Sequence, residues 1–220
     1  MSNWWSEVRT FVREYRTNFK HTGAVLPSGS SLGNALTRFV RKRDGAAAPL
    51  AILEVGPGTG AVTRHIAASL QAGDVLHLSE LNTSFVELLR KRFDHQPPFC
   101  NVAEQVRVFH GPVEELPHDM QYDLIISGLP LNNFNVDEVE HIFGIFQKLL
   151  KPGGTLSFFE YIGIRKVRAM VSDAPGKERL RGIARCMEGV LERGEIHRDH
   201  VWPNVPPAYV HHVRFAKETA

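Results

Sequence analysis

The chain has 220 residues, of which 43% are hydrophobic and 23% charged, as is typical of a soluble domain with a sizeable core. The formal net charge of +2 indicates no polyanionic partner. No run approaches the ~18 apolar residues of a membrane span, and two cysteines without metal-ligand or redox spacing favour a reducing cytoplasm. The eleven histidines form no ligand set with a carboxylate or cysteine, so we expect no metal site.

The first predicted element is an amphipathic helix over residues 4–19. Aromatic and aliphatic side chains recur at helical spacing on one side, and arginines occupy the others, which also argues against a signal peptide. Such a helix either docks on the core of its own domain or lies in a membrane interface, with its arginines facing anionic lipid. The candidate membrane-binding residues of this helix are Trp4, Trp5, Phe11, Arg13 and Arg16.

A turn-rich connector over residues 21–31 links this helix to the rest of the chain. A short helix is predicted over residues 32–41, with Ser30 or Ser31 as its cap. We therefore expect two parts. Residues 1–31 form the amphipathic helix and connector, and residues 32–220 form one α/β domain that includes a helical insertion at 162–195.

Predicted strands and helices alternate after a polar linker at residues 41–49. This alternation predicts a mostly parallel, seven-stranded sheet with helices on both faces. Its last two strands follow each other closely and form an antiparallel pair at the sheet edge. The strands are expected at 50–55, 75–79, 106–110, 122–127, 155–160, 198–202 and 209–215. The helices are expected at 60–70, 83–93 and 136–150, and the helical insertion has a break at 173–176.

The segment EVGPGTG, residues 54–60, joins a predicted strand to a predicted helix. Its three glycines permit a tight turn that a ligand can approach closely. A dinucleotide site would have the third glycine one residue later. Glu54 would also repel a pyrophosphate, whereas it suits the positively charged amino group of a methionine moiety. The plain alternative is an ordinary glycine-rich turn.

A second acidic residue, Glu80, ends the next predicted strand, twenty residues after Gly60. A carboxylate at this place in a doubly wound fold accepts the hydroxyls of a ribose. The plain alternative is a solvated loop glutamate.

Five segments, in this order, resemble the class I S-adenosylmethionine methyltransferase fold: ILEVGPGTG (52–60), Glu80, GPVEEL (111–116), YDLIIS (122–127) and LKPGG (150–154). The resemblance covers residues 50–160. It implies a Rossmann-like domain that uses S-adenosyl-L-methionine and releases S-adenosyl-L-homocysteine. The adenine is expected over Pro112 and Val113, near Glu114. Many relatives have an acidic residue in the place of Pro112, and backbone amides are one alternative to it for holding the adenine amino group. The candidate cofactor-binding residues are Glu54, Gly56, Pro57, Gly58, Gly60, Glu80, Leu81, Pro112, Val113, Ser127 and Ser28.

A narrower resemblance involves TGAVLPSG (22–29), SGLPLNNF (127–134) and NVPPA (204–208). These segments are similar to bacterial phospholipid N-methyltransferases, including relatives that methylate ornithine lipids. The resemblance implies a cytoplasmic protein, peripheral at the inner membrane, that methylates a lipid amine stepwise. The insertion is longer than in the simplest members of that family. Its basic residues either contact lipid phosphates or form a solvated face. The candidates there are Arg165, Lys166 and Arg168.

The segment from Ser127 to Pro130 ends the fourth predicted strand, where open parallel sheets bind ligands. Methyl transfer moves a positive charge onto the acceptor nitrogen, and carbonyl groups and aromatic faces stabilise such a charge. Pro130 donates no backbone hydrogen bond and keeps Leu129 extended. For Phe134, core packing is an equal alternative. The candidate catalytic residues are Gly128, Leu129, Pro130, Phe134 and Tyr161.

Two other functions compete with a lipid amine N-methyltransferase. The SGLPL segment is similar to the signature of rRNA and tRNA adenine N-methyltransferases. However, Leu131 stands where an aromatic residue would stack on a flipped base, and no separate basic domain follows. A non-catalytic module is disfavoured by the intact glycines. The expected partners are a membrane lipid with a primary or partly methylated amine and an anionic membrane surface, without nucleic acid.

Overall fold

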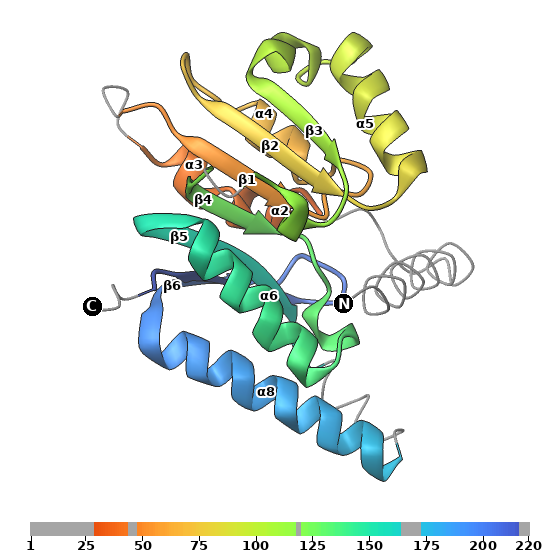
Figure 1. The fold of residues 1–220 in the computed structure, drawn as a ribbon, viewed down its shortest axis with the longest axis vertical. Coiled ribbons are helices and arrows are strands. Elements are labelled where there is room, and N and C mark those ends of the chain that lie inside the picture. The colour runs from red at the N-terminus through yellow and green to blue at the C-terminus, as the bar shows by residue number, and fades with distance from the viewer. Residues whose placement is uncertain (1–28, 44–47, 118–119, 164–172, 216–220) are drawn as a thin grey trace.

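The computed structural model describes residues 29–43, 48–117, 120–163 and 173–215. Seven strands of this part form one sheet in the order β3-β2-β1-β4-β5-β7-β6 (Figure 1). Only β7 is antiparallel to its neighbours, β5 and β6, as predicted. The strands are β1 (Ala51–Val55), β2 (Val75–Glu80), β3 (Val106–His110), β4 (Tyr122–Ser127), β5 (Leu150–Tyr161), β6 (Glu195–Val201) and β7 (Ala208–Val213).

Helices cover both faces of the sheet, and each face has its own hydrophobic cluster. Residues of α6 and α8 pack on one face, and residues of α2 to α5 pack on the other. Because side chains alternate along a strand, β1 sends Leu53 to the first cluster and Ile52 to the second. The helices are α2 (Ser30–Leu36), α3 (Arg38–Arg41), α4 (Thr63–Ala67), α5 (Thr83–His95), α6 (Val136–Leu149) and α8 (Ala174–Gly194). Short 3₁₀ helices span Cys100–Gln105, Val113–Glu115 and Leu131–Asn133.

The predicted helix over residues 32–41 is two helices, α2 and α3, that meet at Thr37. The Thr37 hydroxyl donates to the carbonyl of Gly33 at 2.8 Å, a back-bond that bends helices. The predicted serine cap is wrong, because Gly29 caps α2 without a side-chain bond. Instead, the N–H of Gly29 donates to Oδ1 of Asn204, a residue 175 positions away.

Several other predicted elements have different bounds, and the strand expected at 198–202 is β6, which begins at Glu195 directly after α8. The helix expected at 60–70 is only α4, Thr63–Ala67, because turn residues precede it. The strand expected at 155–160 begins earlier, at Leu150, which pairs with Tyr122 before the register shifts. The expected break at 173–176 is the start of α8, where the Asp173 side chain accepts the N–H of Gly176 at 2.9 Å. Among the described helices, none is long and apolar enough to cross a bilayer.

Helices α6 and α8 lie side by side, and Gly182 allows their close approach (Figure 1). A β-carbon at Gly182 would lie 2.5 Å from Cγ2 of Val136. We expect Gly182→Ala to lower the free energy of unfolding by about 1–3 kcal/mol through overpacking, as measured by urea denaturation.

Gly189 of the same helix is the matched control, because its β-carbon would meet only Nη2 of Arg193, at 3.9 Å. Gly189→Ala is expected to raise the free energy of unfolding by about 0.5–1 kcal/mol, since alanine favours the helix. Equal effects of the two substitutions would show that close packing does not require Gly182.

Candidate active site

The glycine turn lies at the carboxyl ends of β1 and β2. Gly56, Gly58 and Gly60 have φ values of +71°, +59° and +79°, a region that side-chain-bearing residues rarely adopt. The N–H of Gly56 donates to the Ser79 carbonyl at 2.9 Å, and the N–H of Gly60 donates to the Pro57 carbonyl at 2.9 Å. These bonds hold the turn against the end of β2.

Gly60 is also constrained by packing. A β-carbon there would lie 3.0 Å from Cδ2 of Leu89 and 3.2 Å from Cε1 of Phe99. Both residues belong to the hydrophobic cluster between the sheet and helices α2 to α5. The third glycine therefore has a structural reason, close packing, besides the ligand contact that we predict for it.

Glu54 is 1% exposed, and its Oε2 atom has no hydrogen-bond partner among the described residues. Burial raises the pKa of Glu54 to about 8, and the nearby charge of Glu80 adds to this rise. A buried acceptor without a partner, next to a glycine turn, is suited to a cationic ligand group. Glu54 therefore fits the ammonium group of a methionine moiety.

Glu80 is only 2% exposed, so the alternative of a solvated loop glutamate is wrong. Its Oε2 accepts the N–H of Gly58 at 2.9 Å, and its Oε1 accepts the N–H of Asn82 at 2.9 Å. A carboxylate has about four lone-pair sites, so these bonds orient the group and still allow it to accept ribose hydroxyls. Glu80 thus connects the glycine turn to the start of α5.

The predicted adenine contacts lie beside Glu80. The N–H of Gly111 donates to the Glu80 carbonyl at 3.1 Å, and the Ser79 hydroxyl donates to the Gly111 carbonyl at 3.0 Å. These bonds bring the next residues, Pro112 and Val113, close to Glu80 and Leu81. Pro112 and Val113 are buried, and Leu81 is half-buried.

Glu114 follows these residues and carries a signal that sequence reasoning did not use. Neither of its carboxylate oxygens has a hydrogen-bond partner among the described residues, and Oε1 lies 3.6 Å from Nε2 of His141. Burial raises the pKa of Glu114 to about 7, with a further contribution from Glu115. Glu114 thus adds a half-buried carboxylate, with 18% of its side chain exposed, near the predicted adenine segment.

The acceptor turn, Ser127 to Pro130, contacts the glycine turn directly. The N–H of Gly128 donates to the Val55 carbonyl at 2.8 Å, and a β-carbon on Gly128 would lie 2.7 Å from the Gly56 carbonyl oxygen. The N–H of Leu129 donates to the buried Ser127 hydroxyl at 3.3 Å. The structure therefore brings the two turns that the sequence singled out to one edge of the sheet.

The two predicted aromatic residues lie on opposite faces of the sheet. Tyr161, at the end of β5, is half-buried against the α2-side cluster and packs edge-on against Phe159 at 5.1 Å. Phe134 is 2% exposed within the α6-side cluster, and its carbonyl accepts a bond from Arg179 at 2.7 Å. Core packing thus accounts for Phe134, while the roles of both rings at an amine stay predictions.

Sequence reasoning missed Asn132 in the short helix after the acceptor turn. Its Oδ1 atom is buried and has no hydrogen-bond partner among the described residues. Within the same part of the chain, no group of three or more metal-ligating side chains is present. The predicted residues outside the described ranges are Trp4, Trp5, Phe11, Arg13, Arg16, Ser28, Arg165, Lys166 and Arg168.

The strand order, the glycine turn and the two buried carboxylates define a Rossmann-like domain suited to an adenosyl ligand. Residues 52–154 match the model of a family described as a methyltransferase domain. Residues 52–154, slightly under half of the chain, therefore resemble a methyltransferase domain, and the cofactor indicated for such a domain is S-adenosylmethionine.

Similar proteins include an ornithine lipid N-methyltransferase of Singulisphaera acidiphila. It is 28% identical over 142 residues, which are 63% of this chain and 71% of that protein. The polyketide synthase component of lovastatin nonaketide synthase from Aspergillus terreus is 32% identical over 152 residues, 68% of this chain but 5% of the synthase. A Bacillus cereus O-methyltransferase, solved in complex with S-adenosylhomocysteine, has a TM-score of 0.63 at 17% identity and covers 93% of this chain and 90% of its own. This last likeness confirms the fold.

Proposed function

We propose that the protein transfers methyl groups from S-adenosylmethionine to the amine of a membrane lipid headgroup. The headgroup belongs to a phosphatidylethanolamine-type phospholipid or an ornithine lipid, and the transfers occur in successive steps at the membrane surface. The observation that carries this proposal is the contact between the acceptor turn, residues 127–130, and the glycine turn. The similarity to an ornithine lipid N-methyltransferase supports the same substrate class.

The chemistry of the acceptor turn favours nitrogen over oxygen as the acceptor. A hydroxyl must lose its proton to become a good nucleophile, and a positioned base normally removes it. The turn from Ser127 to Leu131 contains no residue that acts as a base near neutral pH. A lipid ammonium group loses its proton to water far more readily than a hydroxyl does, and it does so again before each further transfer. The neutral amine then has its lone pair and needs position and a partner for the charge that develops on it. The carbonyls of Gly128 and Leu129 meet both needs in this proposal.

The donor supplies the methyl group as a sulfonium cation. In this chain, Glu54 would bind its ammonium group, Glu80 its ribose hydroxyls, and the segment at Pro112 and Val113 its adenine. Leu131 is 3% exposed, so it offers no surface on which a flipped base could stack. This burial counts against methylation of RNA adenine.

Attachment to the membrane is part of the same proposal. The amphipathic helix over residues 4–19 would hold the protein at the cytoplasmic side of the inner membrane. The basic residues at 165–168 would add contacts to phosphates. The division into residues 1–31 and 32–220, with an insertion at 162–195, belongs to this proposal as well.

The test is mass spectrometry of membrane lipids from cells that express the protein, compared with cells that express Glu54→Gln. We expect an amine-containing lipid to appear as a series of species that each carry one more methyl group on nitrogen. The Glu54→Gln cells should lack this series, because the donor is held poorly. Methylation confined to hydroxyl oxygens, or lipids identical in the two cultures, would contradict the proposal.

A further inference from the structure

The loop between β6 and β7, WPNVPP at residues 202–207, exposes two large apolar side chains. Trp202 is 62% exposed and Val205 is 68% exposed, the highest values for large apolar side chains in the part of the chain that the structure describes. The next values are 42% for Ile196 and 39% for Val75. Two such residues on one short loop indicate a contact surface.

Three hydrogen bonds hold the loop in place. The buried side chain of Asn204 accepts the N–H of Gly29 at 3.2 Å and donates to the Pro206 carbonyl at 2.7 Å. The N–H of Ile162, just beyond β5, donates to the Pro207 carbonyl at 2.8 Å. These bonds and the three prolines of the loop restrict it to few conformations. Binding to a partner therefore costs little conformational entropy at Trp202 and Val205.

The loop lies at the edge of the sheet that carries the active site. Strand β6 is antiparallel to β7, which is antiparallel to β5, so β5 and β6 run in the same direction. The end of β6 therefore lies on the same side as the end of β5. Trp202 and Val205 are exposed on the side where the donor and acceptor turns also lie.

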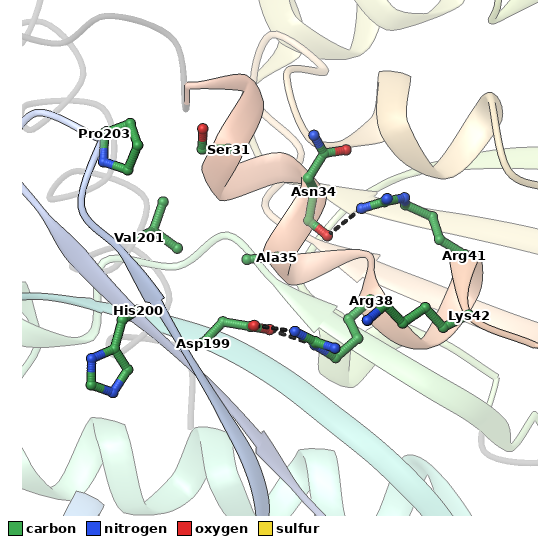
Figure 2. A pocket seen from close by; sticks show the side chains of 10 residues that line it. All are labelled: Ser31, Asn34, Ala35, Arg38, Arg41, Lys42, Asp199, His200, Val201 and Pro203. Atoms are coloured by element: carbon green, nitrogen blue, oxygen red, sulfur yellow. Dashed lines mark hydrogen bonds and ion pairs between the residues drawn. The ribbon is translucent and has the colours of Figure 1, made fainter.

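A basic groove adjoins the loop (Figure 2). Its walls come from α2 and α3 on one side, and from β6 and Pro203 of the loop on the other. Arg38 is bonded to Asp199 across the groove, while Arg41 and Lys42 are exposed. The groove is lined by three cations, Arg38, Arg41 and Lys42, and by one carboxylate, Asp199. Its net charge is therefore positive.

We infer that the β6–β7 loop and this groove dock the catalytic edge onto an anionic phospholipid surface. Tryptophan favours the headgroup region, valine enters the acyl boundary, and Arg41, which donates to the Asn34 carbonyl at 3.0 Å and so reaches back along α2, faces lipid phosphates. The inference rests on the proposed function, because a lipid amine reaches the acceptor turn only if this edge faces the membrane. It adds a second contact, on the domain itself, to the one expected from residues 4–19.

Tryptophan fluorescence tests the inference directly, because the three tryptophans are Trp4, Trp5 and Trp202. In the Trp4→Phe, Trp5→Phe variant of the whole chain, Trp202 is the only tryptophan, so excitation beyond the absorption of the four tyrosines reports Trp202 alone. With vesicles of phosphatidylglycerol and phosphatidylcholine, we expect its emission to shift to shorter wavelength and to be quenched by brominated acyl chains. Emission that vesicles neither shift nor quench would overturn the inference.

Vesicle flotation with matched variants gives a second readout. Trp202→Ala with Val205→Ser should lower vesicle partitioning by about tenfold, as loss of interfacial apolar area implies. Ile196→Ser is the control, since this exposed residue lies at the other end of β6, ~20 Å away by strand geometry. Arg41→Gln should lose about fivefold, mainly at low salt. Thermal unfolding checks that each variant keeps its fold. A loss as large in Ile196→Ser as in the loop variant would overturn the inference.

The experiments separate this inference from the proposed function. If Trp202 penetrates vesicles but no lipid amine is methylated, the docking surface stands and the proposed substrate is wrong. If lipid amines are methylated while Trp202 remains in water, the proposed function stands and the docking surface is wrong.

Discussion

Replacement of Gly58 by valine is expected to lower the affinity for S-adenosylmethionine by about a hundredfold, because the turn cannot keep its shape. Gly58 has a φ of +59°, and its N–H donates to Oε2 of Glu80. A β-branched residue is strained at this φ, so the backbone will rotate and release Glu80. Isothermal titration calorimetry measures the affinity.

Gly153→Val is the matched control. Gly153 has a φ of +82°, and no heavy atom lies within 4 Å of the position that its β-carbon would take. It lies near the beginning of β5, at the opposite edge of the sheet from the glycine turn. We expect a comparable loss of thermal stability from the two substitutions but a loss of affinity only for Gly58→Val. Equal affinities would mean that the donor binds elsewhere.

Donor binding is expected to strengthen about tenfold per pH unit between about pH 6 and 8 and then to level off. The reason is Glu54, whose pKa of about 8 keeps the carboxyl largely neutral at neutral pH. An ammonium partner favours the ionised form, so binding lowers this pKa and releases a proton. Calorimetry in buffers of different ionisation enthalpy should detect about one proton released near pH 7. In Glu54→Gln, binding should be weaker and should follow pH much less. An unchanged slope in that variant would remove Glu54 from the site.

The Glu54 carboxyl should also affect the free energy of unfolding of the protein when no donor is bound. Its pKa is raised in the folded chain, from 4.5 to about 8. The stabilising contribution of its neutral form is therefore full below about pH 4.5 and is lost as pH rises through about 8, a change of up to about 5 kcal/mol. Urea denaturation of wild type and Glu54→Gln across this range should give curves that converge at low pH.

The parts of the fold that the sequence predicted correctly, including where the two turns of the candidate site lie, are those set by local rules. Runs of apolar residues alternating with helices identify a parallel sheet, and both turns at its carboxyl edge follow from strand ends at Val55 and Ser127. Positive φ at Gly56, Gly58 and Gly60 is likewise a local property. Sequence and structure agree there because few residues can replace glycine.

What the sequence did not predict depends on contacts between distant residues. The cap of α2 is Gly29, held by Asn204, and no local pattern links these two positions. The split of Phe134 and Tyr161 between opposite faces follows from how α6 and α2 cover the sheet. The buried oxygens of Glu54 and Asn132 that lack a hydrogen-bond partner among the described residues arise only when surrounding elements exclude water. Burial of single polar atoms is a property of the assembled chain.

The contact between Gly128 and the carbonyl of Gly56 involves main-chain atoms alone. The spacing between the two turns is therefore set by the backbone and not by any side-chain rotamer. Substitutions of the neighbouring Ser127, Leu129 or Pro130 side chains should leave that spacing in place, so the two turns form a fixed frame within which side chains can vary.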